Sequence, residues 1–348
     1  MEIDLAAVAH NVSAAARWKK PICAVVKADG YGHGDVPLAE AMLAAGAERL
    51  AVALVEEGVR LREAGITAPI LLLSEPPVDD LAEAAHWRLT LTVYRTTTVD
   101  LLAAGEPVEV EIKIDTGMHR VGAPPDELLA LLARVEEVPN LWLKGIWSHL
   151  AVADEDPDFT AHQIAEFDKT THGIGLPRHL ANTAAAALFP DSRFDEIRIG
   201  LGLYGLYPCS EARPVVDLRP AMRVVSHIAY TQRQVKGSRP SYGRRRPLTD
   251  DATLATIPIG YADGVPRLWS EGEVLVKGRR YPIAGTITMD QMIVDVGDDA
   301  VAVGDEVVLL GRQGSEEITV DDWAVAAQTI AYEIVTGIGP RLPRRYLG

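Results

Sequence analysis

The stretch AVVKADGYGHG at residues 24–34 joins the end of a predicted β-strand to a glycine-rich turn. In a barrel of parallel strands the carboxyl ends of the strands face the active site, so Lys27 would project from the floor of a pocket. Burial lowers the pKa of a lysine and makes its amine nucleophilic, as Schiff-base chemistry requires. The glycines would let a ligand approach the backbone closely, and Tyr31 offers a hydroxyl to a phosphate. The alternative is a surface lysine whose aliphatic stem covers apolar surface.

Short β-rich runs alternate with segments of helical periodicity through the first part of the chain. Helical segments such as 36–46 and 125–136 separate the runs. The runs lie at 22–26, 49–53, 69–73, 89–93, 108–114, 141–148, 178–181 and 195–199. This alternation is typical of strand–helix units around a parallel sheet, and eight units predict an α/β fold with an N-terminal (β/α)8 TIM barrel.

The pattern changes after residue 215, where helical periodicity fades. Strands are expected at 222–235, 252–259, 274–284, 291–296 and 306–310, joined by turns rich in Gly, Asp and Arg. Only 319–328 is predicted to be helical there, with Thr319 as its N-cap. We therefore expect a barrel domain over 11–218 and a mainly-β domain over 219–348 that residues 1–10 join.

Composition limits the classes of partner and compartment. The 348 residues carry a formal net charge of −15, which would repel nucleic acid and anionic lipid. The two cysteines, Cys23 and Cys209, and the absence of a basic leader favour a reducing, cytoplasmic setting. No apolar run approaches the ~20 residues that span a bilayer, so we expect no membrane segment. The histidines are scattered singly and no metal-binding motif occurs, so no metal is expected and His33, His119, His162, His172 and His179 are assigned no role.

The stretch around Lys27 resembles the cofactor-lysine segment of the alanine racemases, barrel-type enzymes that use pyridoxal 5'-phosphate (PLP). Seven further segments occur in the order and spacing of that family: IKIDTGMHRVG at 112–122, GIWSHLAVAD at 145–154, HLANTAA at 179–185, IRIGLGLYG at 197–205, SYG at 241–243, IPIGYADG at 257–264 and TMDQ at 288–291. Together they extend over nearly the whole chain, which makes the resemblance far more specific than any one motif.

The resemblance implies that Lys27 forms the Schiff base with PLP and acts as the base on one face of the substrate carbon. Tyr242 would be the base on the other face. The family's active site lies at a head-to-tail homodimer interface, so Tyr242, Tyr261, Met289 and Asp290 would be presented to Lys27 of the other subunit. The reaction implied is the interconversion of L-alanine and D-alanine, which supplies D-alanine for peptidoglycan of the cell wall.

The same resemblance assigns supporting residues. Arg198 would face the pyridine nitrogen of PLP and, because an arginine does not give up its proton, keep that nitrogen largely unprotonated. His149 would link Arg198 to Tyr242, and Arg120 would steady either the substrate carboxylate or the tyrosine that approaches it. Lys113 matches a lysine that is often carbamylated, although an ordinary ion pair with Asp115 is an equal alternative. The remaining cofactor-binding residues implied are Tyr31, Asn182, Thr183, Gly200 and Leu201.

Other interpretations differ in chemistry. The GLGLYG stretch at 200–205 satisfies G-x-G-x-x-G, but Pro208 and Pro214 prevent the long helix that a dinucleotide site requires. A racemase of serine or of another amino acid, and a barrel-type PLP decarboxylase, stay open, whereas a PLP-carrier barrel would lack the second domain. Pro340 stands where some members of the family have a tyrosine that contacts the phosphate. The arginines at 244–246 are interpreted as a solvated turn.

Overall fold

The computed structural model describes residues 1–348, which form two compact units. One unit is Ala6–Arg219, and the other combines Met1–Leu5 with Pro220–Gly348. Residues 6–10, which we expected in the second unit, lie in helix α1 (Leu5–Ala16) and belong to the first. The reason is packing: Asn11, on the buried face of α1, donates hydrogen bonds to the carbonyls of Leu203 and Arg219.

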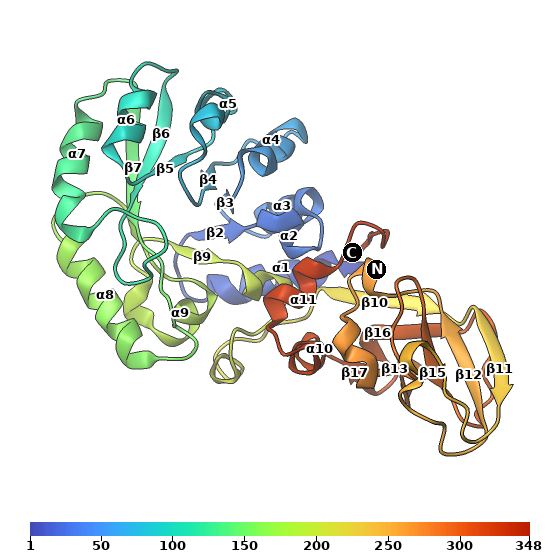
Figure 1. The fold of residues 1–348 in the computed structure, drawn as a ribbon. Helices are drawn as coiled ribbons and strands as arrows, with labels where there is room; N and C mark the ends of the chain where they lie inside the picture. The colour runs from blue at the N-terminus through green and yellow to red at the C-terminus, as the bar shows by residue number, and fades with distance from the viewer. The chain divides into compact units, whose positions relative to one another are not determined.

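The first unit is a closed barrel of eight parallel strands (Figure 1). The strands are β2 (Ile22–Val25), β3 (Arg49–Val52), β4 (Ile70–Leu72), β5 (Leu91–Val93), β6 (Val108–Lys113), β7 (Leu141–Trp147), β8 (Arg178–His179) and β9 (Ile197–Ile199). They pair in the orders β4-β3-β2-β9 and β5-β6-β7-β8. Parallel bridges from Leu71 to Thr90 and from His179 to Glu196 join the two sheets at both edges and close the ring. The predicted TIM barrel is confirmed.

Helices lie outside the ring of strands and cover its apolar outer face (Figure 1). They are α3 (Asp35–Ala44), α4 (Val55–Glu63), α5 (Leu81–His86), α6 (Thr96–Leu102), α7 (Leu128–Glu136), α8 (Pro157–Thr171) and α9 (Thr183–Leu188). Helix α8 shows how the sequence sets a boundary. Asp156 caps it by accepting a hydrogen bond from the Phe159 amide, and Pro157 occupies its first turn.

The second unit is built mainly from strands. A seven-stranded sheet has the order β14-β13-β16-β10-β1-β18, with β17 paired to β16, and a smaller sheet has the order β11-β12-β15. The strands are β1 (Glu2–Asp4), β10 (Met222–His227), β11 (Tyr230–Gln234), β12 (Ala252–Ile257), β13 (Glu273–Val276), β14 (Arg279–Pro282), β15 (Met292–Asp295), β16 (Glu306–Gln313), β17 (Glu316–Ile318) and β18 (Arg345–Leu347). Both ends of the chain therefore contribute a strand, because β1 pairs with β10 and with β18.

Three predictions for the second unit differ from the structure. The expected strand 274–284 is the antiparallel pair β13 and β14, separated by Lys277 and Gly278. The expected strand 222–235 is two strands, because β10 pairs with β16 whereas β11 pairs with β12. The pairing partner changes at Ile228 and Ala229, whose amides donate to the Asp305 and Thr256 carbonyls. The expectation of a single helix is wrong, because α11 (Ala331–Gly337) follows α10 (Val320–Ala327). The sequence of α11, AYEIVTG, gives a weak helix signal because it is short and contains three β-branched residues and a glycine. Thr319 caps α10 as expected.

Candidate active site

Most of the predicted site residues of the barrel unit lie at the carboxyl ends of its strands. Lys27 follows β2, Lys113 is the last residue of β6, and His149 lies shortly after β7. Asn182 and Thr183 follow β8, and Gly200 and Leu201 follow β9. Only Arg120 is reached through a longer loop after β6. Because these strands are parallel, their carboxyl ends meet at one end of the barrel, so the structure brings these residues together.

Lys27 begins a turn of left-handed backbone that includes residues other than glycine. Ala28, Asp29 and Gly30 have φ values of 54°, 53° and 58°, and left-handed backbone costs roughly 1–2 kcal/mol per non-glycine residue. The buried carboxylate of Glu57 holds the turn from α4. It accepts a 2.6 Å hydrogen bond from the Ala28 amide at one oxygen, and bonds from two amides near the end of β3 at the other. Strain held by a buried partner next to Lys27 is typical of a functional site.

The two lysines of the site have lowered pKa values. Burial lowers the pKa of Lys27, and the charge of Arg120 lowers it further, while Glu57 opposes the shift. Lys113 is 3% exposed, and burial followed by the charges of Arg198 and Arg120 lowers its pKa to about 7. Both amines are therefore more easily neutral, and hence more nucleophilic, than an exposed lysine.

Positive charge at this end of the barrel exceeds negative charge. A small depression is lined by Lys113, Asp115, Arg120 and His149 among others. Asp115 accepts hydrogen bonds from two amides of its own loop, and the charge of Asp115 is not sufficient to restore the pKa of Lys113. Cations gathered without matching carboxylates indicate a site for an anion.

The Trp147 ring, at the end of β7, supports the polar groups around it. Lys113 Nζ lies 4.3 Å from the centre of this ring and the Arg198 guanidinium carbon lies 4.6 Å from it. The His179 ring stacks on Trp147 with an interplanar angle of 18°. The indole thus fixes the positions of two cations by cation–π contact.

Arg198 is buried and held by several acceptors. Its Nη1 donates to His179 Nδ1 at 2.7 Å and to the His179 carbonyl at 3.0 Å. Its Nη2 donates to the carbonyls of Ser148 at 2.6 Å and Leu180 at 3.1 Å, and lies 3.5 Å from His149 Nδ1. Burial lowers the pKa of Arg198 to about 10, so the guanidinium stays charged at neutral pH. Burial and the Arg198 charge also hold the pKa of His149 well below its ordinary value, so His149 is neutral.

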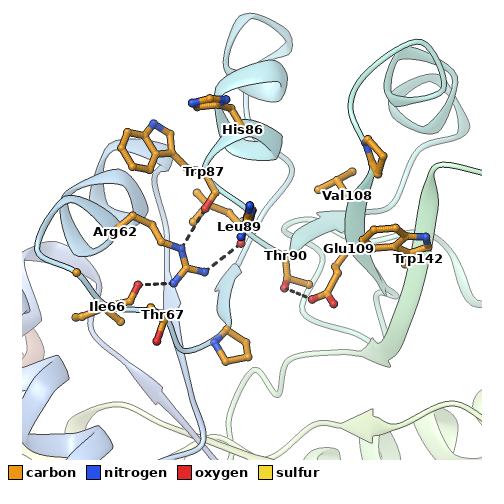
Figure 2. Close-up of a pocket in the computed structure, with 14 residues that line it drawn as sticks. Arg62, Ile66, Thr67, His86, Trp87, Leu89, Thr90, Val108, Glu109 and Trp142 are labelled. Carbon is orange, nitrogen blue, oxygen red and sulfur yellow. Dashed lines mark hydrogen bonds between the residues drawn. The ribbon is translucent and has the colours of Figure 1, made fainter.

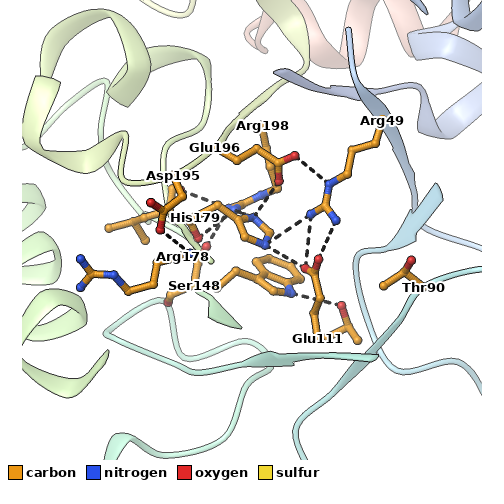
Figure 3. Close-up of polar contacts among 12 residues, drawn as sticks. Arg49, Thr90, Glu111, Ser148, Arg178, His179, Asp195, Glu196 and Arg198 are labelled. Carbon is orange, nitrogen blue, oxygen red and sulfur yellow. Dashed lines mark hydrogen bonds and ion pairs between the residues drawn. The ribbon is translucent and has the colours of Figure 1, made fainter. Parts of the chain in front are cut away.

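Behind Arg198 lies a buried network that the sequence analysis did not assign (Figure 3). His179 Nε2 lies 2.8 Å from Glu111 Oε2, and Arg49 forms ion pairs with Glu111 at 2.6 Å and with Glu196 at 2.8 Å. A signal was present in the strand at 108–114, VEVEIKI, where Glu109, Glu111 and Lys113 alternate with apolar residues. In the barrel Glu111 and Lys113 are buried, so this polar face of β6 is the one that serves the site.

The residues expected to bind a phosphate also lie together. Tyr31 is buried and stacks on Tyr204. A Cβ at Gly200 would lie 2.5 Å from the Tyr31 hydroxyl, and a Cβ at Gly202 would lie 2.8 Å from Thr183 Cγ2. A side chain at either position would collide with these groups, and the close approach sets a tyrosine hydroxyl and a threonine side chain beside the backbone of residues 200–202. A phosphate is the anion that such donors suit. Asn182 caps α9 by accepting from the Ala185 amide, which occupies its side-chain oxygen.

The remaining predicted residues lie in the second unit, on two adjoining segments. The amides of Tyr261 and Ala262 donate to the carbonyls of Thr288 and Met289, which ties the two segments together. The Thr286 side chain in turn donates to the Tyr242 carbonyl. Tyr242, Tyr261 and Met289 have exposed fractions of 73%, 41% and 52%. Asp290 accepts a hydrogen bond from Arg341 at 2.7 Å.

A larger cavity, of about 550 Å³, lies at the opposite end of the barrel and is lined by residues that precede or begin β4 to β7 (Figure 2). Two of its charged side chains, Arg62 and Glu109, have hydrogen-bond partners within the barrel. Arg62 donates to the carbonyls of Ile66, Ala68, Trp87 and Arg88. Glu109 bonds Lys144 and Thr90. The Arg62 and Glu109 side chains thus have hydrogen-bond partners within the barrel, while burial and the charge of Arg88 lower the pKa of Arg62.

Barrel strands that end in buried amines, together with a β-rich second unit, define a barrel-type enzyme of the kind that holds an anionic cofactor. The chain matches the family models "Alanine racemase, N-terminal domain" over residues 3–208 and "Alanine racemase, C-terminal domain" over 221–346. The chain belongs to the alanine racemase family.

Individual relatives agree along the whole chain. An alanine racemase of Nostoc sp. is 40% identical, covering 99% of this chain and 94% of its own length. An alanine racemase of Frankia casuarinae is 43% identical, covering 99% and 95%. The crystal structure of a Bacillus anthracis alanine racemase with bound L-Ala-P is 38% identical with a TM-score of 0.94, covering 100% and 94%. A histidine racemase of Leuconostoc mesenteroides is 31% identical with a TM-score of 0.92, covering 100% and 97%. No helix of the protein is long and apolar enough to cross a membrane.

Proposed function

We propose that this protein is a PLP-dependent alanine racemase that interconverts L-alanine and D-alanine with two bases. The observation that carries the proposal is Lys27, an amine with a lowered pKa at the carboxyl end of β2 in a chain that matches both domains of the family. D-alanine made in this way serves peptidoglycan synthesis, and we place the protein in the cytoplasm. Both cysteines are free, which suits a reducing compartment.

The residues around Lys27 fit PLP. Tyr31, Thr183 and the amides of Gly200 and Leu201 would hold the phosphate, and Asn182 would support them as the cap of α9. When bound, PLP supplies a conjugated ring that withdraws electrons and acidifies the Cα–H of an amino acid joined to it. Arg198 would face the ring nitrogen as a donor that does not release its proton, which limits how strongly the ring withdraws electrons.

The proton is moved by two groups on opposite faces of the substrate carbon. Lys27 takes or returns the proton at its Nζ, and its lowered pKa makes the neutral amine more accessible than in an exposed lysine. Tyr242 does the same at its hydroxyl from the other face. His149, neutral and beside Arg198, would link Arg198 to that hydroxyl.

Tyr242 reaches Lys27 in a homodimer, where the second unit of one chain completes the site of the other. The exposure of Tyr242, Tyr261 and Met289 supports this arrangement, because aromatic and methionine side chains that gather on a surface mark contact sites. A monomer would hold only one of the two bases in each site and would be inactive.

Alanine is the substrate that the residues favour. Arg120 would bind the carboxylate, and Tyr261, Met289 and Asp290 would narrow the space for the side chain. The structural likeness to a histidine racemase keeps a larger or polar substrate as a second candidate.

Lys113 would carry a carbamate. A neutral lysine amine is the form that adds carbon dioxide, and burial together with two arginines lowers the pKa of Lys113 to about 7. The modification would turn a cation into an anion beside Arg120 and Arg198, which relieves the repulsion among them. Mass spectrometry of the intact protein in bicarbonate and in bicarbonate-free buffer would detect it.

Product analysis tests the reaction directly. The purified protein with PLP is incubated with L-alanine, L-serine or L-histidine, and the D-amino acid, the keto acid and carbon dioxide are measured together. We expect D-alanine as the main product, with far slower conversion of the other two substrates. Carbon dioxide release would identify a decarboxylase, and faster conversion of serine or histidine would overturn the assignment of alanine.

A further inference from the structure

His179, at the end of β8, lies between Arg198 and Glu111, and these contacts fix which of its nitrogens carries a proton. Arg198 Nη1 lies 2.7 Å from His179 Nδ1, and a guanidinium only donates, so Nδ1 accepts. His179 Nε2 lies 2.8 Å from Glu111 Oε2 and 3.4 Å from Arg49 Nη2. The shorter contact is to a carboxylate oxygen, which only accepts, so Nε2 carries the proton and donates. Burial lowers the pKa of His179 to about 4, so the ring is neutral at neutral pH. The hydrogen bonds thus select the tautomer protonated at Nε2.

Glu111 keeps its acceptor role because Arg49 holds it as a carboxylate. Arg49 donates to Glu111 Oε1 at 2.6 Å and to Oε2 at 3.3 Å. Burial alone would raise the pKa of Glu111, but the charge of Arg49 and the hydrogen bonds from His179 and Arg49 keep it below its ordinary value. Oε2 therefore accepts a hydrogen bond from each neighbour. Loss of the Nε2 proton of His179 would remove one of these two hydrogen bonds.

The tautomer determines which donor of Arg198 is left for a ligand. The two Nη groups of Arg198 are engaged by His179 Nδ1, by the His179 carbonyl and by the carbonyls of Ser148 and Leu180. Its Nε–H is the remaining donor of the guanidinium. A proton on His179 Nδ1 would set two donors against each other 2.7 Å apart and would turn the guanidinium away.

We infer that His179 is a positioning residue: by accepting at Nδ1, it holds the Arg198 guanidinium in one orientation that leaves Nε–H for the ring nitrogen of the cofactor. Glu111 keeps that acceptor available. The role of Arg198 rests on the proposed function, but the tautomer of His179 is a property of the protein alone.

The first test is the tautomer itself, measured by ¹⁵N NMR on histidine-labelled protein without cofactor, with the His179 signals assigned by their loss in His179→Asn. We expect a proton on Nε2 alone. In Glu111→Gln, Arg49 donates to the amide oxygen, so the amide NH₂ faces His179 Nε2. We then expect the His179 proton to move from Nε2 to Nδ1. Glu196→Gln is the matched control. It also removes a carboxylate that pairs with Arg49, but Glu196 lies 3.7 Å from Nδ1 and does not contact Nε2, so the tautomer stays.

The second test compares His179→Asn with His179→Gln, whose side-chain amides differ in length. The side-chain oxygen of Asn occupies nearly the place of Nδ1, whereas the amide of Gln reaches the place of Nε2. His179→Asn should keep PLP affinity and the absorbance of bound PLP close to those of wild type. His179→Gln should lower the affinity by about tenfold, the effect of one lost buried hydrogen bond, and shift the absorbance. Thermal unfolding of both variants shows whether stability alone separates them.

Either of two results would overturn the inference. One is a wild-type His179 protonated at Nδ1, or a tautomer that Glu111→Gln leaves unchanged. The other is an equal change of PLP affinity and absorbance in His179→Asn and His179→Gln. If the protein racemised no amino acid, the proposed function would fail while the NMR result stood, so the two failures are distinguishable.

Discussion

The charged side chains at the two ends of the barrel differ in their partners and in the residue types whose pKa values are lowered. At the amino ends of β4 to β7 the larger cavity is lined by Arg62 and Glu109, and each finds its partners within the barrel. At the carboxyl ends Lys27 and Lys113 have lowered pKa values because burial and neighbouring arginines disfavour their charge. The lowered pKa values of two lysine amines, and not the volume of a cavity, therefore point to the carboxyl ends of the strands as the candidate site.

Lys27→Ala should separate the two ends most strongly. Loss of the amine removes both the cofactor linkage and one base, so racemisation should fall by roughly 10³-fold or more, measured as D-alanine formed from L-alanine. Trp142→Ala, which truncates an exposed side chain that lines the opposite cavity, is the control and should leave the rate unchanged. A similar loss of racemisation in both variants would show that the carboxyl ends of the strands are not the specific site of the reaction.

Tyr242→Phe should abolish proton transfer on one face while leaving the cofactor in place. We expect racemisation in both directions to fall by about 10²- to 10⁴-fold, the usual contribution of a positioned base. The visible absorbance of bound PLP should persist. Tyr230→Phe, a change of the same kind at another exposed tyrosine of the second unit, should have no effect. Retained activity in Tyr242→Phe would refute the two-base assignment.

Glu57→Gln tests the strained turn that carries Lys27. The amide replaces a carboxylate that accepts from three backbone amides, so the free energy of unfolding should fall by about 1–3 kcal/mol in urea titrations. Racemisation should fall with it, because the turn sets the position of the amine. Glu56→Gln changes the exposed neighbour on the same helix and should be neutral. An equally stable Glu57→Gln would show that the turn needs no such support.

The lowered pKa of Lys113 should make the free energy of unfolding depend on pH. Its pKa is about 7 in the folded protein, against 10.5 for an unperturbed lysine. Between these values the unfolded state binds more protons, so stability rises with pH across the window and the unfavourable contribution is fully present below pH 7. In bicarbonate-free buffer, the stability gained by Lys113→Met should therefore shrink from pH 7 toward pH 10, by at most about 1.4 kcal/mol per pH unit. A gain that does not change with pH would place the folded pKa near its ordinary value.

The sequence predicted the barrel well because every unit repeats the same alternation of apolar strand and amphipathic helix. It predicted the second unit less well because local signals there are weak: α11 is short, and the break between β10 and β11 is set by which sheet supplies the partners. Lys27 was found because a polar residue interrupts an apolar strand. His179, Glu111 and Arg49 were missed because their significance lies in contacts between strands far apart in sequence, which a single sequence does not display.

The central claim is that Lys27 of one chain and Tyr242 of another flank the same carbon atom. Mixing equal amounts of Lys27→Ala and Tyr242→Phe under conditions that allow subunit exchange tests it. A heterodimer of the two would contain one site with both bases intact, so about a quarter of wild-type activity should return. A mixture as inactive as either variant, with exchange verified by mass spectrometry, would contradict the account.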